Sequence, residues 1–494
     1  MRIGSLYCRI TRTTVPRYYL CSAQFSQHAG RICSRSLSLT DAYALRRQQN
    51  QLCHRQISTD APSEPPVDHT KPRNLVRRVI QEKGLPASDE DVSIEEGKTQ
   101  KRDRKESRTP PPIPWRSMIE GKTLHFPNLR EVFKDWPCAE NPHIEDITKN
   151  IKVRTTEKNR LAKPKQRLLL NSDIPSFVAK CYPAVTFDRS IDIVCRYTMW
   201  LFLWSHYINK IATNPPKNID AINDYLVDCM DFAMLSFRII PEDLVERSRG
   251  LQRDTLVPDN MTLFGKLGVS LNDIGLPARS SFSRVVCEYI RSVQTRMEMM
   301  ALPGVPNVSS YMKAALPTVE IYPQLELYDY LIYKDNQYPK PSHMRKSKYI
   351  KYVNMMTKNL AEIALIIRDI YSVRTDVAAK SQFNMVVSSF FDGDRETPQS
   401  AEEVVDSLME LLRAKKIEFD AAVMKLSQET RLADQKRIGK ISDKKAVTHE
   451  KHIDTLVKWC RYTITGYVDW NLKSNRYHLA DSIQEDGSLK VTLE

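Results

Sequence analysis

Residues 465–479 read Thr-Gly-Tyr-Val-Asp-Trp-Asn-Leu-Lys-Ser-Asn-Arg-Tyr-His-Leu. The first half of this stretch ends the last of six long segments in which apolar residues recur at spacings of three and four. That spacing is typical of helices with one buried face. Prolines separate several of these segments and strand signals are almost absent, so the sequence predicts an all-α fold. The six segments are 191–211, 219–239, 282–300, 349–373, 401–426 and 449–472.

Basic residues are concentrated at the beginning of the chain. Residues 1–59 contain nine arginines and one acidic residue, Asp41, so more than half of the net charge of +14 lies there. An Arg-rich and Ser-rich segment that is nearly free of acidic residues is typical of a mitochondrial transit peptide. We therefore expect residues 1–59 to direct the protein to mitochondria. The alternative is a disordered basic tail or a misassigned start codon on a cytoplasmic protein.

The composition changes twice more along the chain. Residues 60–114 are rich in Pro, Lys, Arg and Glu without apolar periodicity, which predicts a disordered linker. Residues 115–494 then form the expected helical domain, and their mild positive charge argues against nucleic-acid binding. The longest strongly apolar run, near 199–204, is much shorter than the roughly 20 residues of a membrane span. The cysteine spacing indicates neither a zinc site nor a disulfide framework.

The stretch 465–479 closely resembles the C-terminal signature of fungal sesquiterpene cyclases of the trichodiene and longiborneol synthase kind, within the class I terpene synthases. In that family an Arg-Tyr pair contacts the substrate diphosphate, and here the pair is Arg476 and Tyr477. A guanidinium fork fits phosphate oxygens and a phenol adds a donor. The resemblance implies a class I terpenoid synthase helical bundle that follows the disordered N-terminal segment.

Residues 197–209 resemble the helix that carries the aspartate-rich motif, Phe-Leu-Trp-Asp-Asp-x-x-Asp/Glu, of the same family. Carboxylates at those positions converge on Mg²⁺ ions that bridge to the diphosphate. Here the three positions hold Ser205, His206 and Asn209, so no carboxylate is present. The resemblance makes His206 and Asn209 candidate metal positions, and we expect Mg²⁺ to bind poorly.

Residues 368–376, Arg-Asp-Ile-Tyr-Ser-Val-Arg-Thr-Asp, resemble the second metal motif, Asn-Asp-x-x-Ser-x-x-x-Glu. Ser372 and Asp376 keep two of the three metal positions, which stack along one helical face. Arg368 stands in the third position, and a guanidinium does not bind cations. It could instead pair with the diphosphate directly, alongside Arg476.

The resemblance also suggests residues for the rest of the substrate. The family's arginine that senses the diphosphate is absent from the segment around Tyr311, and Lys313 is the nearest base there. Trp200, Trp204 and Tyr207 recur at three- and four-residue spacing and could line a pocket that stabilises a carbocation. An ordinary helical core explains the same aromatic spacing.

The resemblance implies a divergent terpene cyclase that ionises a prenyl diphosphate, with farnesyl diphosphate as the expected substrate. A second possibility is a terpene synthase-like protein that has lost ionisation and binds or otherwise transforms a prenyl or terpenoid ligand. A third is a non-catalytic helical interaction module in mitochondria. The sequence leaves open whether the protein forms a homodimer.

Overall fold

The computed structural model describes residues 115–158, 161–186, 188–213, 219–239, 258, 260–271, 276–300, 304–336, 349–392, 397–438, 443–474 and 476–494. All of them belong to one unit of the chain, Glu106–Glu494. The expected transit peptide, 1–59, and the expected linker, 60–114, lie outside the described residues.

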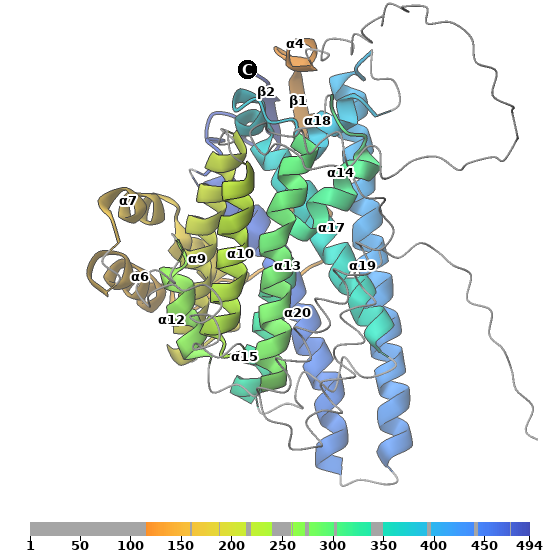
Figure 1. Ribbon diagram of the computed structural model, residues 1–494. Coiled ribbons are helices and arrows are strands. Elements are labelled where there is room, and N and C mark those ends of the chain that lie inside the picture. The colour runs from red at the N-terminus through yellow and green to blue at the C-terminus, as the bar shows by residue number, and fades with distance from the viewer. Residues whose placement is uncertain are drawn as a thin grey trace, which may run out of the picture. The chain divides into compact units, whose positions relative to one another are not determined.

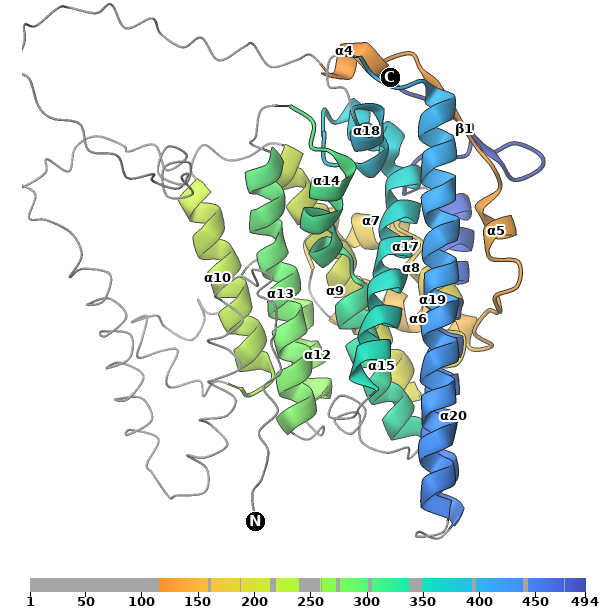
Figure 2. The same cartoon turned by 90° about the vertical axis from the view of Figure 1, so that its right-hand side faces the viewer.

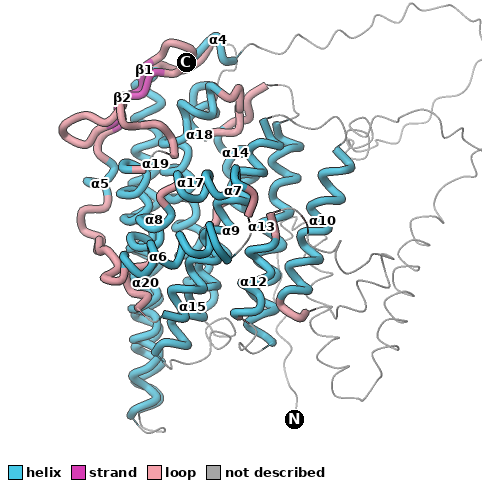
Figure 3. The backbone as a smooth tube through the Cα atoms, turned by 90° about the vertical axis from the view of Figure 1, so that its left-hand side faces the viewer, coloured by secondary structure: helices cyan, strands magenta, loops and turns pink. Residues whose placement is uncertain are grey.

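Helices make up most of this unit, which confirms the all-α prediction (Figure 3). Each of the six periodic segments falls on a long helix. The long helices are α9 (Asp188–Thr213), α10 (Ile219–Ser236), α13 (Leu276–Met300), α15 (Ile321–Asn336), α17 (Ile350–Ala378), α19 (Ala401–Ile438) and α20 (Asp443–Lys473). The shorter ones are α4 (Trp115–Ile119), α5 (Leu129–Val132), α6 (Ile144–Val153), α7 (Lys163–Asn171), α8 (Ile174–Cys181), α12 (Thr262–Ser270), α14 (Val308–Ala315) and α18 (Met385–Phe390).

The long helices form two neighbouring groups. In Figure 1, α9, α10 and α13 lie side by side, and α13 packs against both of the others. Figure 2 shows the second group, in which α17 packs against α15, α19 and α20. Contacts between α13 and α15 join the two groups. No helix in the described part of the chain is both long enough and apolar enough to cross a bilayer.

The charged segment 426–451, which the sequence suggests is a solvated helix or a surface insertion, belongs to the two longest helices. It supplies the end of α19 and the beginning of α20, which run side by side in Figure 1. Arg431 of α19 pairs with Glu450 of α20 at 2.7 Å. The described residues of this segment are therefore helical, as the first possibility predicts.

Helix α20 lies unusually close to α8, and the C-terminal signature explains why. A side chain at Gly466 would collide with the carbonyl oxygen of Lys180, so only glycine permits this approach. Lys180 also pairs with Asp469 at 2.6 Å, and Trp470 Nε1 donates to the Asp173 carbonyl at 3.0 Å. The first half of the signature therefore fixes the position of α20 within the bundle.

A two-stranded antiparallel sheet fixes the segment that follows α20. Strand β2 (Leu489–Thr492) pairs with β1 (Thr123–Phe126), so that Thr492 lies opposite Thr123. On the way to β2, Asp481 receives two hydrogen bonds from Arg374 of α17, each 2.9 Å long. The residues between α20 and β2 are thus held against α17.

Candidate functional site

A cavity of about 390 Å³ is lined by α9, α13, α17 and the segment after α20. The structure brings both motif regions and the C-terminal pair to this one cavity, although they are far apart in the sequence. Of the residues singled out from the sequence, those that line it are Trp204, Ser205, His206, Asn209, Arg368, Ser372, Asp376, Arg476 and Tyr477.

One face of α9 forms a wall of the cavity. Phe202, Ser205, His206 and Asn209 recur at three- and four-residue spacing and all line it. None of the four is acidic. Burial and the nearby Arg476 lower the pKa of His206, which favours its neutral form.

Trp200 and Tyr207 lie on another face of α9 and do not line the cavity. The Trp200 ring is fully buried, with its centroid 4.6 Å from that of Phe264 on α12. Tyr207 packs edge-on against Tyr225 of α10, at 5.3 Å. Because residues 200 and 207 are on the side of the helix opposite residue 202, these two rings serve the core between helices.

The structure does not bring Lys313 to the cavity either. Lys313 is exposed on α14, whereas Tyr311, two residues earlier, is fully buried. Residues two apart on a helix point in different directions. The Tyr311 hydroxyl contacts Asp369 and lies 3.4 Å from Arg368 Nη2.

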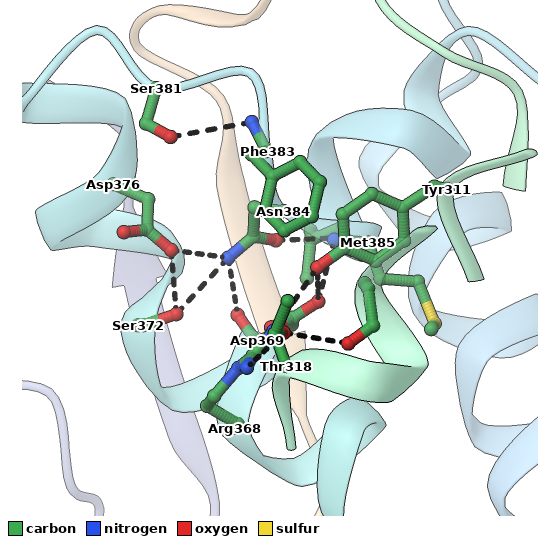
Figure 4. Close-up of polar contacts among 12 residues, drawn as sticks. Tyr311, Thr318, Arg368, Asp369, Ser372, Asp376, Ser381, Phe383, Asn384 and Met385 are labelled. Carbon is green, nitrogen blue, oxygen red and sulfur yellow. Dashed lines mark hydrogen bonds and ion pairs between the residues drawn. The ribbon is translucent and has the colours of Figure 1, made fainter. Parts of the chain in front are cut away.

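A buried polar network on α17 holds Arg368 in place (Figure 4). Arg368 Nε donates to Asp369 at 3.0 Å, and Nη1 donates to the Thr318 hydroxyl at 3.2 Å. Asp369 also accepts from the Met385 backbone at 2.9 Å, at the beginning of α18. Burial alone would lower the pKa of Arg368, but the Asp369 carboxylate raises it well above its usual range. The guanidinium is therefore charged and fixed in orientation.

The other two α17 motif residues bond to each other. Ser372 Oγ donates to Asp376 Oδ2 at 2.7 Å, and Asn384 Nδ2 donates to the same oxygen at 2.8 Å (Figure 4). Asn384 Nδ2 also lies 2.9 Å from the Asp369 carbonyl oxygen, so it links both ends of the motif. Burial raises the pKa of Asp376, although its two hydrogen bonds oppose the shift.

Arg296 of α13 is a cavity residue that no sequence motif indicates. Its Nη1 donates to Asn209 Oδ1 at 2.7 Å, and its guanidinium lies 5.2 Å from the centre of the Phe383 ring. Within the described part of the chain, no carboxylate is close enough to form an ion pair with Arg296. Burial and the neighbouring Arg368 lower the pKa of Arg296. Its place on a periodic helix was predictable, but not its direction.

Arg476 lies at the inner end of the cavity, over aromatic rings. Its guanidinium carbon is 4.6 Å from the centre of the Phe202 ring and 5.9 Å from that of Trp470. Burial would lower the pKa of Arg476, but the Tyr477 and Tyr467 hydroxyls raise it. No acidic side chain among the described residues lies within ion-pair distance of it. Cation–π contacts with these rings therefore stabilise the positive charge of Arg476.

Comparisons with known proteins agree with this arrangement. No family model matches the chain. The sesquiterpene cyclase hepA of Aspergillus oryzae is 20% identical over 394 residues, which cover 77% of this chain and 96% of that protein. The linalool/nerolidol synthase of Streptomyces clavuligerus, solved with 2-fluorogeranyl diphosphate, matches at a TM-score of 0.50 and 16% identity, over 69% of this chain and 98% of that one. α-Eudesmol synthase matches at 0.51 and 14%, over the same shares. The chain has the fold of the class I terpene synthases.

The cavity of this terpene synthase-like protein does not fit a magnesium cluster. Among the described residues, no three His, Cys, Asp or Glu side chains could hold a metal ion together. Of the four candidate metal positions, only Asp376 is a carboxylate, and its Oδ2 already accepts two hydrogen bonds. The Asn209 oxygen accepts from Arg296, so a guanidinium stands where a cation would bind. Mg²⁺ in phosphate sites is usually held by one or two carboxylates besides the phosphate oxygens, and the single carboxylate among these four positions is already hydrogen-bonded to Ser372 and Asn384.

A small apolar pocket of about 40 Å³ adjoins the cavity of the terpene synthase-like protein. The two hollows share the side chains of Phe202, Ser205, Glu320, Arg368 and Arg476, which form the boundary between them. Beyond that boundary most of the lining is apolar or aromatic, and it includes Phe177, Leu201, Val319, Ile321, Ala364, Ile464, Tyr467 and Trp470. A charged mouth thus leads to an apolar interior. Phe202 and Glu320 lie at the junction; Phe202 is the first residue of the α9 motif, whereas no sequence motif indicates Glu320.

Proposed function

We propose that this terpene synthase-like protein acts on a prenyl diphosphate as a terpene cyclase, with farnesyl diphosphate as the expected substrate. The observation that carries the proposal is the position of Arg476, between a polar cavity and an aromatic pocket. A prenyl diphosphate has the same division into an anionic head and an apolar tail. The relative hepA bears the name of a sesquiterpene cyclase, and the Streptomyces enzyme was solved with a prenyl diphosphate analogue.

The proposed reaction begins when the bond between the prenyl carbon and the diphosphate oxygen breaks. The electron pair leaves with the diphosphate, and the prenyl group becomes an allylic carbocation. Arg368 and Arg476 stabilise the charge that develops on the leaving group, and Tyr477 adds a hydroxyl donor. Phe177 and Tyr467 are aromatic residues of the apolar pocket, where a carbocation is attracted by roughly 0.5–2 kcal/mol per ring.

A second candidate function is binding of a prenyl or terpenoid ligand without ionisation. The observation that favours it is the lack of carboxylates on the α9 wall, because Mg²⁺ bound there would otherwise draw the diphosphate away. The two candidates differ in turnover and share the same binding site.

Turnover separates the two candidates. We expect purified protein incubated with farnesyl diphosphate to release inorganic diphosphate and to form terpene products detectable by gas chromatography with mass spectrometry. Arg476→Gln should slow this release by on the order of 100-fold, as expected for loss of a donor to a developing anion. Arg413→Gln is the matched control, because Arg413 is exposed on α19 away from the cavity. Binding without release, with farnesyl, geranyl and geranylgeranyl diphosphate alike, would establish the second candidate; no binding would reject both.

A further inference from the structure

We propose that the cavity binds the diphosphate group without metal ions, through a guanidinium clamp formed by Arg296, Arg368 and Arg476. This inference rests on the proposed function, since it specifies what recognises the head of that substrate. It also assigns a binding role to Arg296, which belongs to neither metal motif.

The three arginines come from three separate elements and line a single cavity. Arg296 lies on α13, Arg368 on α17, and Arg476 in the segment held by the pairing of β1 with β2. A diphosphate has several oxygens directed to different sides, and a guanidinium has five N–H donors, so each arginine can donate to them in addition to its protein partners. Three planar guanidinium groups from three elements of the fold can therefore bind such a ligand with more directional hydrogen bonds than three ammonium groups could.

The clamp is partly organised before a ligand arrives. Arg368 is oriented by Asp369 and Thr318, so it loses little freedom on binding. Arg296 is held by the oxygen of Asn209, a neutral partner that does not cancel its charge. Arg476 rests on the Phe202 ring, which stabilises the cation without neutralising its charge.

The acidic side chains of the lining are Glu320, Asp369 and Asp376. Asp369 is turned toward Arg368 and the beginning of α18, and Asp376 is bonded to Ser372. Glu320 lies at the boundary with the apolar pocket. Because these carboxylates do not face one another as a metal site would require, the cavity can attract an anion more readily than a divalent cation.

The test compares affinities with and without metal. Isothermal titration calorimetry of the full chain with inorganic diphosphate, and with farnesyl thiodiphosphate, is run in excess EDTA and again in millimolar MgCl₂. We expect saturable binding of both ligands in EDTA, with no gain in affinity when Mg²⁺ is present. Arg296→Gln should weaken binding in EDTA about tenfold, as for loss of charged hydrogen bonds. Arg296→Lys should restore part of the affinity, because charge returns without the fork.

Arg291→Gln serves as the matched control, since Arg291 is exposed on the same helix and does not line the cavity. Binding that requires Mg²⁺ would overturn the clamp while leaving the proposed function intact. No binding of farnesyl thiodiphosphate under either condition would reject the proposed function itself. Full affinity in Arg296→Gln would exclude Arg296 from the clamp. If that variant does not fold, the EDTA titrations of the unaltered chain and of Arg296→Lys decide.

Discussion

The two cavity walls that resemble metal motifs, on α9 and on α17, differ in the burial and hydrogen bonding of their motif residues. On α9, His206 and Asn209 are exposed, and Asn209 accepts its hydrogen bond from Arg296 at the surface of the cavity. On α17, Asp369 is buried and bonds to Arg368, Tyr311 and the beginning of α18. A carboxylate that only binds ligand can be replaced at no cost to folding, whereas one inside a buried network cannot. The α17 residues that resemble a metal motif are thus part of a buried network, whereas the corresponding α9 residues are not.

The largest expected effect comes from breaking the α17 network. Asp369→Ala leaves the buried Arg368 without its carboxylate partner and removes an acceptor from Tyr311, so we expect a loss of about 3–5 kcal/mol in the free energy of unfolding. Urea denaturation followed by circular dichroism measures it. Asp406→Ala, at an exposed position of α19, should have almost no effect. A loss as small as that of the control would show that the α17 network does not support the fold.

An intermediate effect is expected when carboxylates are added to the α9 wall. The double variant Ser205→Asp, Asn209→Asp should leave the free energy of unfolding within about 0.5 kcal/mol of the unaltered chain, because these positions are partly exposed. Metal-free diphosphate binding should weaken by about tenfold, equivalent to about 1.4 kcal/mol, because the new charges attract Arg296. Calorimetry in EDTA checks this, with Gln428→Glu on the exposed surface of α19 as the control. If the affinity for diphosphate in EDTA is unchanged, the absence of carboxylates from the α9 wall is not important for metal-free binding.

The smallest effect concerns the pH dependence of stability at Asp376. Burial raises the pKa of Asp376, so its contribution to stability is complete below the unfolded value near 3.8 and is lost as pH rises through the native value. Asp376→Asn resembles the protonated form, and its stability relative to the unaltered chain should therefore increase from acidic to neutral pH.

Urea denaturation at about pH 2.5 and about pH 7.5 measures that trend, because this range includes the titration of both carboxyl groups. Asp481→Asn provides a control of opposite sign, because the hydrogen bond from Arg374 lowers the pKa of Asp481. Ionised Asp481 stabilises the fold, and this stabilisation is lost as pH falls. The stability of Asp481→Asn relative to the unaltered chain should therefore be lowest at neutral pH and should rise toward acidic pH. The same trend in both variants would contradict the assignment of burial as the cause at Asp376.

The sequence was sufficient for the fold class, because helix periodicity is local and long helices repeat it many times. It also indicated which segments meet, since Ser205, Ser372 and Arg476 all reach one cavity. It could not place Arg296, because one arginine on an amphipathic helix resembles its neighbour Arg291 until the helix is packed. Only tertiary packing decides which of the two faces inward.

Two other features of the structure could not be predicted from the sequence, also because they depend on tertiary packing. Helix α9 carries aromatic residues on more than one face, so spacing alone could not separate Trp204 in the cavity wall from Trp200 in the core. The pairing of β1 with β2 joins short segments from opposite parts of the described chain. Strands of four residues with a distant partner leave almost no periodic signal in the sequence.

The pairing of β2 with β1 also determines when the cavity can be completed during synthesis. The helices that carry Arg296 and Arg368 leave the ribosome before β2 has been made. Until that strand joins β1, the segment bearing Arg476 has only one of its two attachments. A nascent chain can therefore gather most of its helical bundle early, yet it acquires an intact ligand site only after β2 has left the ribosome and paired with β1.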